Sequence, residues 1–325
     1  MMAVRAFAFL SLMTAMSVCP AHSQTAPLAD HHQHLFSPGI ATLISPPPPA
    51  APVEPIDAAR VVAMLDAAGI KRAVVLSVAY IYGGPARKVE NEYDRVKAEN
   101  DWTSQQVARF PDRLVAFCSF NPLKDYALAE LARCAKDPRL RRGLKLHFAN
   151  SVVDYHNPRH VQQLQRVFRA ANDHRMPIVV HMRASISQKV AYGPAEARVF
   201  LNEILPAAPD VAIQIAHLAG AGGYSDPPVD AALSVFVAAI EKADPRANRL
   251  YFDVTTVALP DAPADQLKQI ATRIRQLGTR RILYGSDAAS GTNLPPREGW
   301  AAFRRVPLSE AEFTSIANNV PPYLQ

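Results

Sequence analysis

The chain has 325 residues, of which 49% are hydrophobic and 20% are charged, and its formal net charge is +6. This balance is normal for a globular protein, and a chain of this length can bury a large core without disulfides or metals as staples. The charges are mixed along the sequence, and the absence of a basic run argues against a nucleic-acid partner.

Residues 1–23 have the pattern of a secretory signal peptide. One early charge, Arg5, is followed by an apolar run over residues 6–18 and by the small-residue pattern Ala21-His22-Ser23. The apolar run is too short to span a membrane comfortably. We therefore expect residues 1–23 to be removed, one domain over residues 24–325, and an exported protein, periplasmic or secreted, with no membrane attachment after cleavage.

Eight apolar runs alternate with amphipathic segments along the rest of the chain. The runs are near-continuous, as expected for parallel strands that are buried on both faces. They cover residues 28–35, 72–80, 114–120, 143–148, 177–182, 211–218, 250–257 and 281–287. The amphipathic segments predict helices over residues 57–69, 91–110, 125–137, 159–174, 194–205, 230–243, 264–278 and 308–319. In the first of these segments, Asp57 suits the N-cap and Gly69 suits the end of the helix.

The strand centres recur roughly every 30–40 residues, and eight such units are typical of a (β/α)8 TIM barrel with a parallel eight-stranded core. A doubly wound open sheet is the alternative, but it gives no particular reason for eight units. The proline-rich residues 45–55 follow the first strand and can form neither a helix nor an inner strand. They predict a long loop over the active face of the barrel, or else a plain linker.

Cleavage of the signal peptide leaves two of the three cysteines, Cys118 and Cys134. The two side chains could pair in an oxidising compartment. Because Cys118 falls in a predicted strand and Cys134 in a predicted helix, two separate buried thiols are an equally open interpretation.

Ionisable residues gather at the carboxyl ends of the predicted strands, where the active sites of such barrels lie. They are His32, His34, Lys145, His147, His181, Arg183, His217 and Asp287. Residues two apart on a strand share a face, so His32 and His34 point the same way and Gln33 points away. Two neighbouring imidazoles are costly to bury unpaired, and a divalent metal, which binds neutral imidazole, removes that cost. Nitrogen and oxygen ligands without a thiolate suit zinc, with manganese, iron or cobalt as substitutes.

Five motifs occur in order along these strands: DHHQHL, GLKLHF, VVHMR, IAHLAG and YGSDA. In this set and order the chain resembles the amidohydrolase superfamily, and more closely its amidohydrolase-related (amidohydrolase 2) group of metal-dependent hydrolases and non-oxidative decarboxylases. The resemblance covers nearly the whole chain after the signal peptide. It implies that His32, His34, His181 and Asp287 bind one metal, with Asp287 also acting as the proton acceptor.

The resemblance leaves two roles open. It implies that His217 is either a ligand of a second metal or, in one-metal members, a catalytic histidine that orients or deprotonates water. Lys145 lies where some members use a carbamylated lysine to bridge two ions, and an unmodified lysine that pairs with a substrate carboxylate is the alternative. We favour one metal and a catalytic His217.

The remaining polar residues at the strand ends have two interpretations each. Arg183 shares the face of His181 and suits a clamp for a substrate carboxylate, or else a salt bridge to an acidic residue of a loop. His147 shares the face of Lys145, so we list it with Arg183 and Lys145 as a substrate-binding candidate. Asp253 either lines the site or holds a histidine from behind.

These residues predict a metal-dependent hydrolase of a small, carboxylate-bearing amide, lactone or other ester. The expected mechanism is that a metal lowers the pKa of water towards neutrality and that Asp287 accepts the proton. Non-oxidative decarboxylation of an aromatic or muconate-like acid is the alternative, and a non-catalytic binding barrel is a third interpretation. The expected partner is a small molecule, and homo-oligomerisation stays open.

Overall fold

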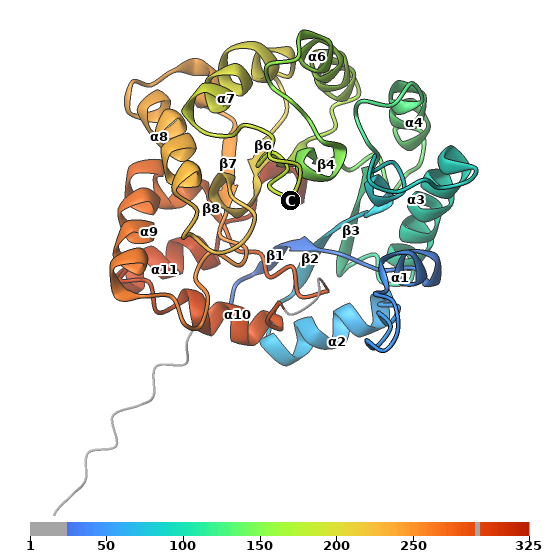
Figure 1. The fold of residues 1–325 in the computed structure, drawn as a ribbon. Helices are drawn as coiled ribbons and strands as arrows, with labels where there is room; N and C mark the ends of the chain where they lie inside the picture. Colours follow the sequence, from blue (N-terminus) through green and yellow to red (C-terminus); the bar gives the residue numbers. More distant parts are fainter. Residues whose placement is uncertain (1–24, 290–292, 325) are drawn as a thin grey trace, which may run out of the picture.

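A computed structural model describes residues 25–289 and 293–324 (Figure 1), so the predicted signal peptide lies outside the described residues. Eight strands form one sheet in chain order, and all neighbours in that order are parallel. They are β1 (Ala29–Gln33), β2 (Arg72–Leu76), β3 (Leu114–Ser119), β4 (Leu144–His147), β5 (Ile178–His181), β6 (Ile213–Ile215), β7 (Leu250–Asp253) and β8 (Ile282–Leu283). Each lies within one of the eight predicted runs, and the predicted (β/α)8 TIM barrel is confirmed.

Backbone hydrogen bonds join the end of the sheet to its beginning. The N–H of His31 in β1 donates to the carbonyl oxygen of Tyr284 at 2.8 Å, and the N–H of Asp287 donates to the carbonyl oxygen of His32 at 2.8 Å. These bonds place the segment after β8 directly beside β1. Residues at the two ends of the sheet therefore meet at the same edge of the barrel.

Helices surround the strands (Figure 1). They are α1 (Pro38–Ile44), α2 (Ala58–Ala68), α3 (Glu92–Ala108), α4 (Ala127–Cys134), α5 (Phe148–Ser151), α6 (Pro158–Asp173), α7 (Pro194–Val199), α8 (Pro227–Glu241), α9 (Ala264–Leu277), α10 (Pro296–Phe303) and α11 (Glu310–Ala317). Asp57 caps α2 by accepting from the N–H of Arg60, and Gly69 ends that helix with a left-handed φ of 72°, as the sequence predicts. No helix among the described residues is both long enough and apolar enough to cross a membrane.

The connection from β1 to α2 is longer than most. It contains α1, which begins at Pro38 after the N-cap Ser37, and residues 45–55 then run without helix or strand. Phe36 and Ile56 form an isolated antiparallel bridge at its base. The proline-rich segment is therefore part of a βα connection, and Phe36 and Ile44 from this connection line the cavity described below.

Cys118 of β3 and Cys134 of α4 form a disulfide, with their Cα atoms 6.1 Å apart. Both side chains are buried. Of the two interpretations of these cysteines, the structure confirms pairing. The disulfide ties the strand to the helix that follows it along the chain.

Candidate metal centre and active site

A cavity of about 430 Å³ opens at the carboxyl ends of the strands. Polar side chains from β1, β4 and β5 and from the segments after β1, β6, β7 and β8 form one part of its wall, and apolar side chains form another. The polar members are His32, His34, Lys145, His147, His181, His217, Thr256, Asp287 and Asn293, and the apolar ones include Phe36, Ile44, Val78, Tyr80, Ile81 and Leu259. Seven of the eight site residues predicted from the sequence therefore line one cavity.

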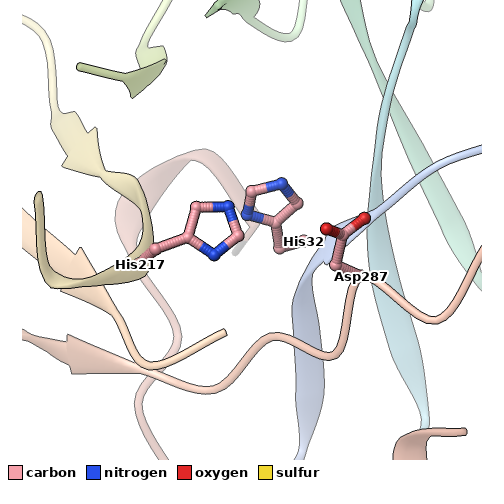
Figure 2. Close-up of side chains that lie close together, drawn as sticks. All are labelled: His32, His217 and Asp287. Atoms are coloured by element: carbon pink, nitrogen blue, oxygen red, sulfur yellow. The ribbon is translucent and has the colours of Figure 1, made fainter. Parts of the chain in front are cut away.

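Three of these side chains come close enough to share an ion. His32, His217 and Asp287 each offer one ligand atom, and these atoms lie within 4.8 Å of one another. Figure 2 shows the two imidazoles and the carboxylate converging from separate segments of the barrel. The structure thus groups His217 with the predicted ligands, whereas the sequence analysis favoured a catalytic role for it.

Hydrogen bonds at the back of the rings fix which nitrogen faces the site. His32 Nδ1 lies 3.1 Å from Asp253 Oδ2, and His217 Nδ1 lies 2.9 Å from the carbonyl oxygen of Thr255. Both partners are acceptors, so each Nδ1 carries the proton and each Nε2 carries the lone pair. Of the two interpretations of Asp253, the structure supports the one in which it holds a histidine from behind.

His34 is oriented in the same way. Its Nδ1 donates to the carbonyl oxygen of Leu76 at 2.6 Å, and its Nε2 lies 3.5 Å from Asp287 Oδ1. The T-shaped contact between the His32 and His34 rings, with centroids 5.2 Å apart, agrees with the prediction that they share a face. Gln33 instead donates to Asp30 and Ser286, away from the cavity.

His181 differs from these three histidines because of His147. The N–H of Asn150 donates to His147 Nδ1 at 3.2 Å, so neutral His147 carries its proton on Nε2. That proton is donated to His181 Nδ1 at 2.8 Å, which leaves the proton of neutral His181 on its own Nε2. A metal bond through His181 Nε2 therefore requires both rings to exchange tautomers, with loss of the Asn150 hydrogen bond. The role of His181 as a ligand stays a prediction.

The backbone at the site adopts conformations that are rare for residues with a side chain. His217 has a φ of 53°, and Thr256 and Asp287 have φ values of 53° and 52°. Left-handed backbone at non-glycine residues is unfavourable and persists where neighbouring contacts hold it. At His217 the backbone N–H donates to Asp253 Oδ1 at 2.8 Å, which ties this conformation to the carboxylate that also holds His32.

Burial keeps the histidines of the site uncharged. Desolvation lowers the pKa of His34 to about 3, and it also lowers the pKa values of His32, His181 and His217. Neutral imidazole is the form that binds a metal. Hence these rings are ready to accept an ion at neutral pH without first losing a proton.

Lys145 and Asp287 both have pKa values close to neutrality. Burial lowers the pKa of Lys145 to about 8, against the opposing effect of Asp253 and Asp287. Burial raises the pKa of Asp287 to about 7, and the charge of Lys145 acts in the opposite direction. The Nζ of Lys145 is 3.2 Å from His32 Nε2, so its amine lies at the ligand cluster itself.

Arg183 is the predicted site residue that the structure does not place in the cavity wall. Its Nε donates to Asp226 Oδ2 at 3.0 Å, and its guanidinium lies 4.7 Å from the centre of the Tyr192 ring. This is the loop salt bridge that the sequence left open as its alternative role. A clamp on a substrate carboxylate would require the Asp226 pair to open.

The residues present fit a divalent metal. Asp287 Oδ1 is buried and has no hydrogen-bond partner among the described residues. The Nε2 lone pairs of His32 and His217 face the same place, and that of His32 accepts from Lys145 Nζ at 3.2 Å, a contact that a bound ion would replace. Nitrogen and oxygen donors without a thiolate are suited to zinc or manganese.

Sequence analysis missed several residues of the site. Gly222, Gly223, Thr256 and Asn293 line the cavity from the segments that follow β6, β7 and β8. These residues follow strand ends closely, and that position was a signal in the sequence. However, small and uncharged residues are common in loops, so their residue types do not distinguish a functional site from an ordinary loop. Gln214, buried in β6, contacts Asp253 and was not recognised either.

Residues 29–319 match the model of a protein family described as amidohydrolase. A comparison with curated proteins finds no match. Among solved structures, the chain is similar to a 5-carboxyvanillate decarboxylase from Sphingomonas paucimobilis, with a TM-score of 0.62 and 16% identity over 90% of this chain and 96% of that one.

Two further structures have the same architecture. A 2,6-dihydroxybenzoate decarboxylase from Rhizobium has a TM-score of 0.62 and 15% identity over 90% of this chain and 96% of that one. A probable 2-pyrone-4,6-dicarboxylic acid hydrolase from Acinetobacter baumannii has a TM-score of 0.56 and 16% identity, with 89% and 96% of the chains covered. Such low identities show the fold alone.

Structures with bound manganese and with bound zinc also occur among the matches. The family match extends over β1 to β8 and includes all the predicted site residues. The chain therefore belongs to the amidohydrolase family.

Proposed function

We propose that this protein is a metal-dependent hydrolase that cleaves an amide, lactone or other ester bond of a small acyl compound. One observation carries the proposal: a buried cation lies directly at the cluster of ligand side chains. The Nζ of Lys145 is 3.2 Å from His32 Nε2, and the ligand atoms of His32, His217 and Asp287 lie within 4.8 Å of one another. A polar, cationic end of a cavity favours reactions in which negative charge develops on oxygen.

His32, His217 and Asp287 would hold the metal, with His34 beside them. When bound, a divalent ion supplies Lewis acidity, which polarises a carbonyl group and lowers the pKa of water. We propose one ion, because the three ligand atoms lie within 4.8 Å of one another. We favour zinc, because the donors are imidazoles and a carboxylate. His181 joins the set only if its tautomer changes as described above.

The side chains of the chain itself supply the proton transfers. Asp287 lies at the ligand cluster, where its carboxylate can take a proton from water and return it to the leaving group. Lys145 faces the same space and stabilises negative charge on the carbonyl oxygen of the substrate. Hydrogen bonds to Asp253 and Thr255 hold His217, so its Nε2 is placed for the metal without having to move.

Decarboxylation is the second candidate, because the cavity wall contains a cation, Lys145, that suits a carboxylate substrate. Arg183 is engaged by Asp226, so Lys145 is the cation that meets a substrate carboxylate among the described residues of the cavity wall. Loss of carbon dioxide removes the negative charge of that carboxylate, and a close ion pair with Lys145 would stabilise the substrate more than the transition state. For this reason we rank hydrolysis first.

Two assays on the zinc-loaded and manganese-loaded protein separate the candidates. A pH-stat measures acid release from small lactones and esters, an amine-specific reagent measures free amine from N-acyl amino acids, and a coupled assay measures carbon dioxide from hydroxybenzoates. We expect release of acid or of amine without carbon dioxide. The reverse result would replace the hydrolase with the decarboxylase, and neither product with any substrate would leave only a binding barrel.

Two neighbouring histidines provide a matched pair of variants. His32→Ala removes a ligand and should abolish turnover together with metal binding. His31→Ala changes the adjacent histidine, which contacts the carbonyl oxygen of Asn319 outside the cavity. It should keep both properties in the folded fraction. Equal losses in the two variants would remove His32 from its proposed role.

We also propose that the protein is exported and acts on a small molecule rather than on a nucleic acid or a membrane. The disulfide between Cys118 and Cys134 supports export, because disulfides persist in oxidising compartments. Fractionation of cells that express the full chain tests this: a processed protein with paired thiols should be found outside the cytoplasm. A full-length, reduced protein in the cytoplasm would contradict it.

A further inference from the structure

The last described segment of the chain lies inside the ring of strands, at the end opposite the cavity. Tyr323 and Leu324 of η7 (Pro322–Leu324) are buried there among side chains of the strands, and the ring of Tyr323 makes a T-shaped contact with Phe117. The packing cluster also contains Ala29, Val74, Leu76, Val115 and Val179.

Two arginines hold the backbone of this segment. Arg72 Nη1 donates to the carbonyl oxygen of Leu324 at 2.6 Å, and Arg142 Nη2 donates to the carbonyl oxygen of Tyr323 at 3.1 Å. The segment is therefore anchored by charge-assisted hydrogen bonds as well as by apolar packing.

From this segment a series of buried hydrogen bonds leads to the candidate metal centre. The hydroxyl of Tyr323 donates to Gln214 Oε1 at 2.5 Å. Gln214 Nε2 donates to Asp253 Oδ2 at 2.7 Å, and the same oxygen accepts from His32 Nδ1 at 3.1 Å. Gln214 and Asp253 are fully buried, so water does not compete for these groups.

The direction of each bond matters more than the number of bonds. A glutamine amide can rotate by a half turn and exchange its oxygen with its nitrogen. Asp253 Oδ2 and the carbonyl oxygen of His31 can only accept, so they select the orientation in which Nε2 faces Asp253. The hydroxyl of Tyr323 completes this orientation by donating to Oε1, which would otherwise be buried without a partner. The opposite orientation would set an amide oxygen against a carboxylate oxygen and would disturb the acceptor that fixes the His32 tautomer.

We propose that Tyr323 and Gln214 are positioning residues for the metal centre, which they reach through Asp253 and His32. The proposal rests on the metal site of the proposed function. Direct partners of metal ligands typically change metal affinity by about 10–100-fold. Tyr323 acts through two intermediates, so we expect the smaller effect of about threefold to tenfold weaker zinc binding in Tyr323→Phe.

The test measures zinc affinity of the full-length protein by competition with a chromophoric chelator after metal removal. Tyr323→Phe keeps the ring and loses only the hydroxyl. Gln214→Met removes the amide that lies between Tyr323 and Asp253. It should weaken zinc binding by the same factor or more. In the double variant the two losses should not add, because both act through the same hydrogen bonds.

Two control variants separate positioning from stability. Leu324→Ala should lower the melting temperature through a cavity in the packing while leaving zinc affinity close to that of the wild type. Tyr126→Phe removes a hydroxyl that donates to Glu92 outside the cavity wall and should not change zinc affinity.

The results divide cleanly. Zinc binding by Tyr323→Phe and Gln214→Met as tight as in the wild type, or fully additive losses in the double variant, would overturn this inference and leave the proposed function standing. A wild-type protein that binds neither zinc nor manganese would overturn both. If Tyr323→Phe does not fold, the affinity of Gln214→Met alone decides the question.

Discussion

The carboxylate of Asp253 offers the sharpest single perturbation of the site. Its Oδ2 accepts from His32 Nδ1 and Gln214 Nε2, and its Oδ1 accepts from the backbone N–H groups of His217 and Thr255. All four partners are donors. In Asp253→Asn one of the two oxygens becomes an NH2 group, so in either orientation two donors face a donor.

The structure sets the size of the expected effect. Burial opposes ionisation of Asp253, but the hydrogen bonds from the ring of His32 and from the backbone N–H of His217 lower its pKa, so the wild-type group is a carboxylate at neutral pH. A hydrogen bond to a charged group contributes about 1.5–3 kcal/mol, and Asp253→Asn loses two of them. We expect the free energy of unfolding of the apoprotein to fall by about 3 kcal/mol or more and zinc affinity to fall by about 10–100-fold.

Chelator competition and urea denaturation of the metal-free protein measure the two quantities separately. Asp230→Asn is the control, since Asp230 pairs with Arg273 and does not line the cavity. It should lower stability without changing zinc affinity. If Asp253→Asn binds zinc as tightly as the wild type, the carboxylate does not orient His32 and the reasoning about tautomers fails.

Three further predictions concern other parts of the molecule. Replacement of both Cys118 and Cys134 by serine removes a cross-link between positions 16 residues apart and should lower the free energy of unfolding by about 3 kcal/mol; an unchanged urea midpoint would contradict this. Burial lowers the pKa of His31 to about 4, so this imidazole stays neutral in the folded state at mildly acidic pH. In the unfolded state it binds a proton once the pH falls below the usual pKa of histidine, about 6.5. Stability should therefore fall by about 3 kcal/mol as the pH drops from 6.5 to 4, and His31→Gln should remove that part of the acid sensitivity, measured as unfolding free energy against pH. Gly285→Ala would place a methyl carbon 2.7 Å from the Cβ of His32, so we expect turnover and zinc binding to fall at least tenfold, and wild-type values would show that the strand can shift.

Much of the barrel could be predicted because its strands are buried on both faces. A run such as residues 177–182 has no polar side chain before its histidine, and that pattern is strong and local. The same reasoning predicted that polar residues at the ends of parallel strands converge on one face of the barrel. His32, His34, Lys145 and Asp287, which were predicted in this way, line one cavity.

The details that the sequence could not supply depend on contacts between distant segments. The hydrogen bond from Asn150 to His147, which sets the tautomer of His181, depends on how the chain turns into α5. The ion pair of Arg183 with Asp226 depends on the path of the loop that precedes α8. The sequence alone therefore cannot show whether this arginine is paired or free to bind a substrate.

The network behind the site shows the same limit. Tyr323 and Gln214 are 109 residues apart and meet only because the last described segment packs inside the barrel. Nothing in the local pattern of either residue predicts this contact. Similarly, the cysteines show their pairing only once β3 and α4 are placed side by side.

The central claim is that side chains from β1, from the segment after β6 and from the segment after β8 form a site for one divalent metal. Elemental analysis of the purified protein after equilibration with zinc and gel filtration tests it most directly. We predict one zinc per chain in the wild type and none in His32→Ala. A wild-type protein without bound metal, or a His32→Ala variant with an unchanged metal content, would contradict the account.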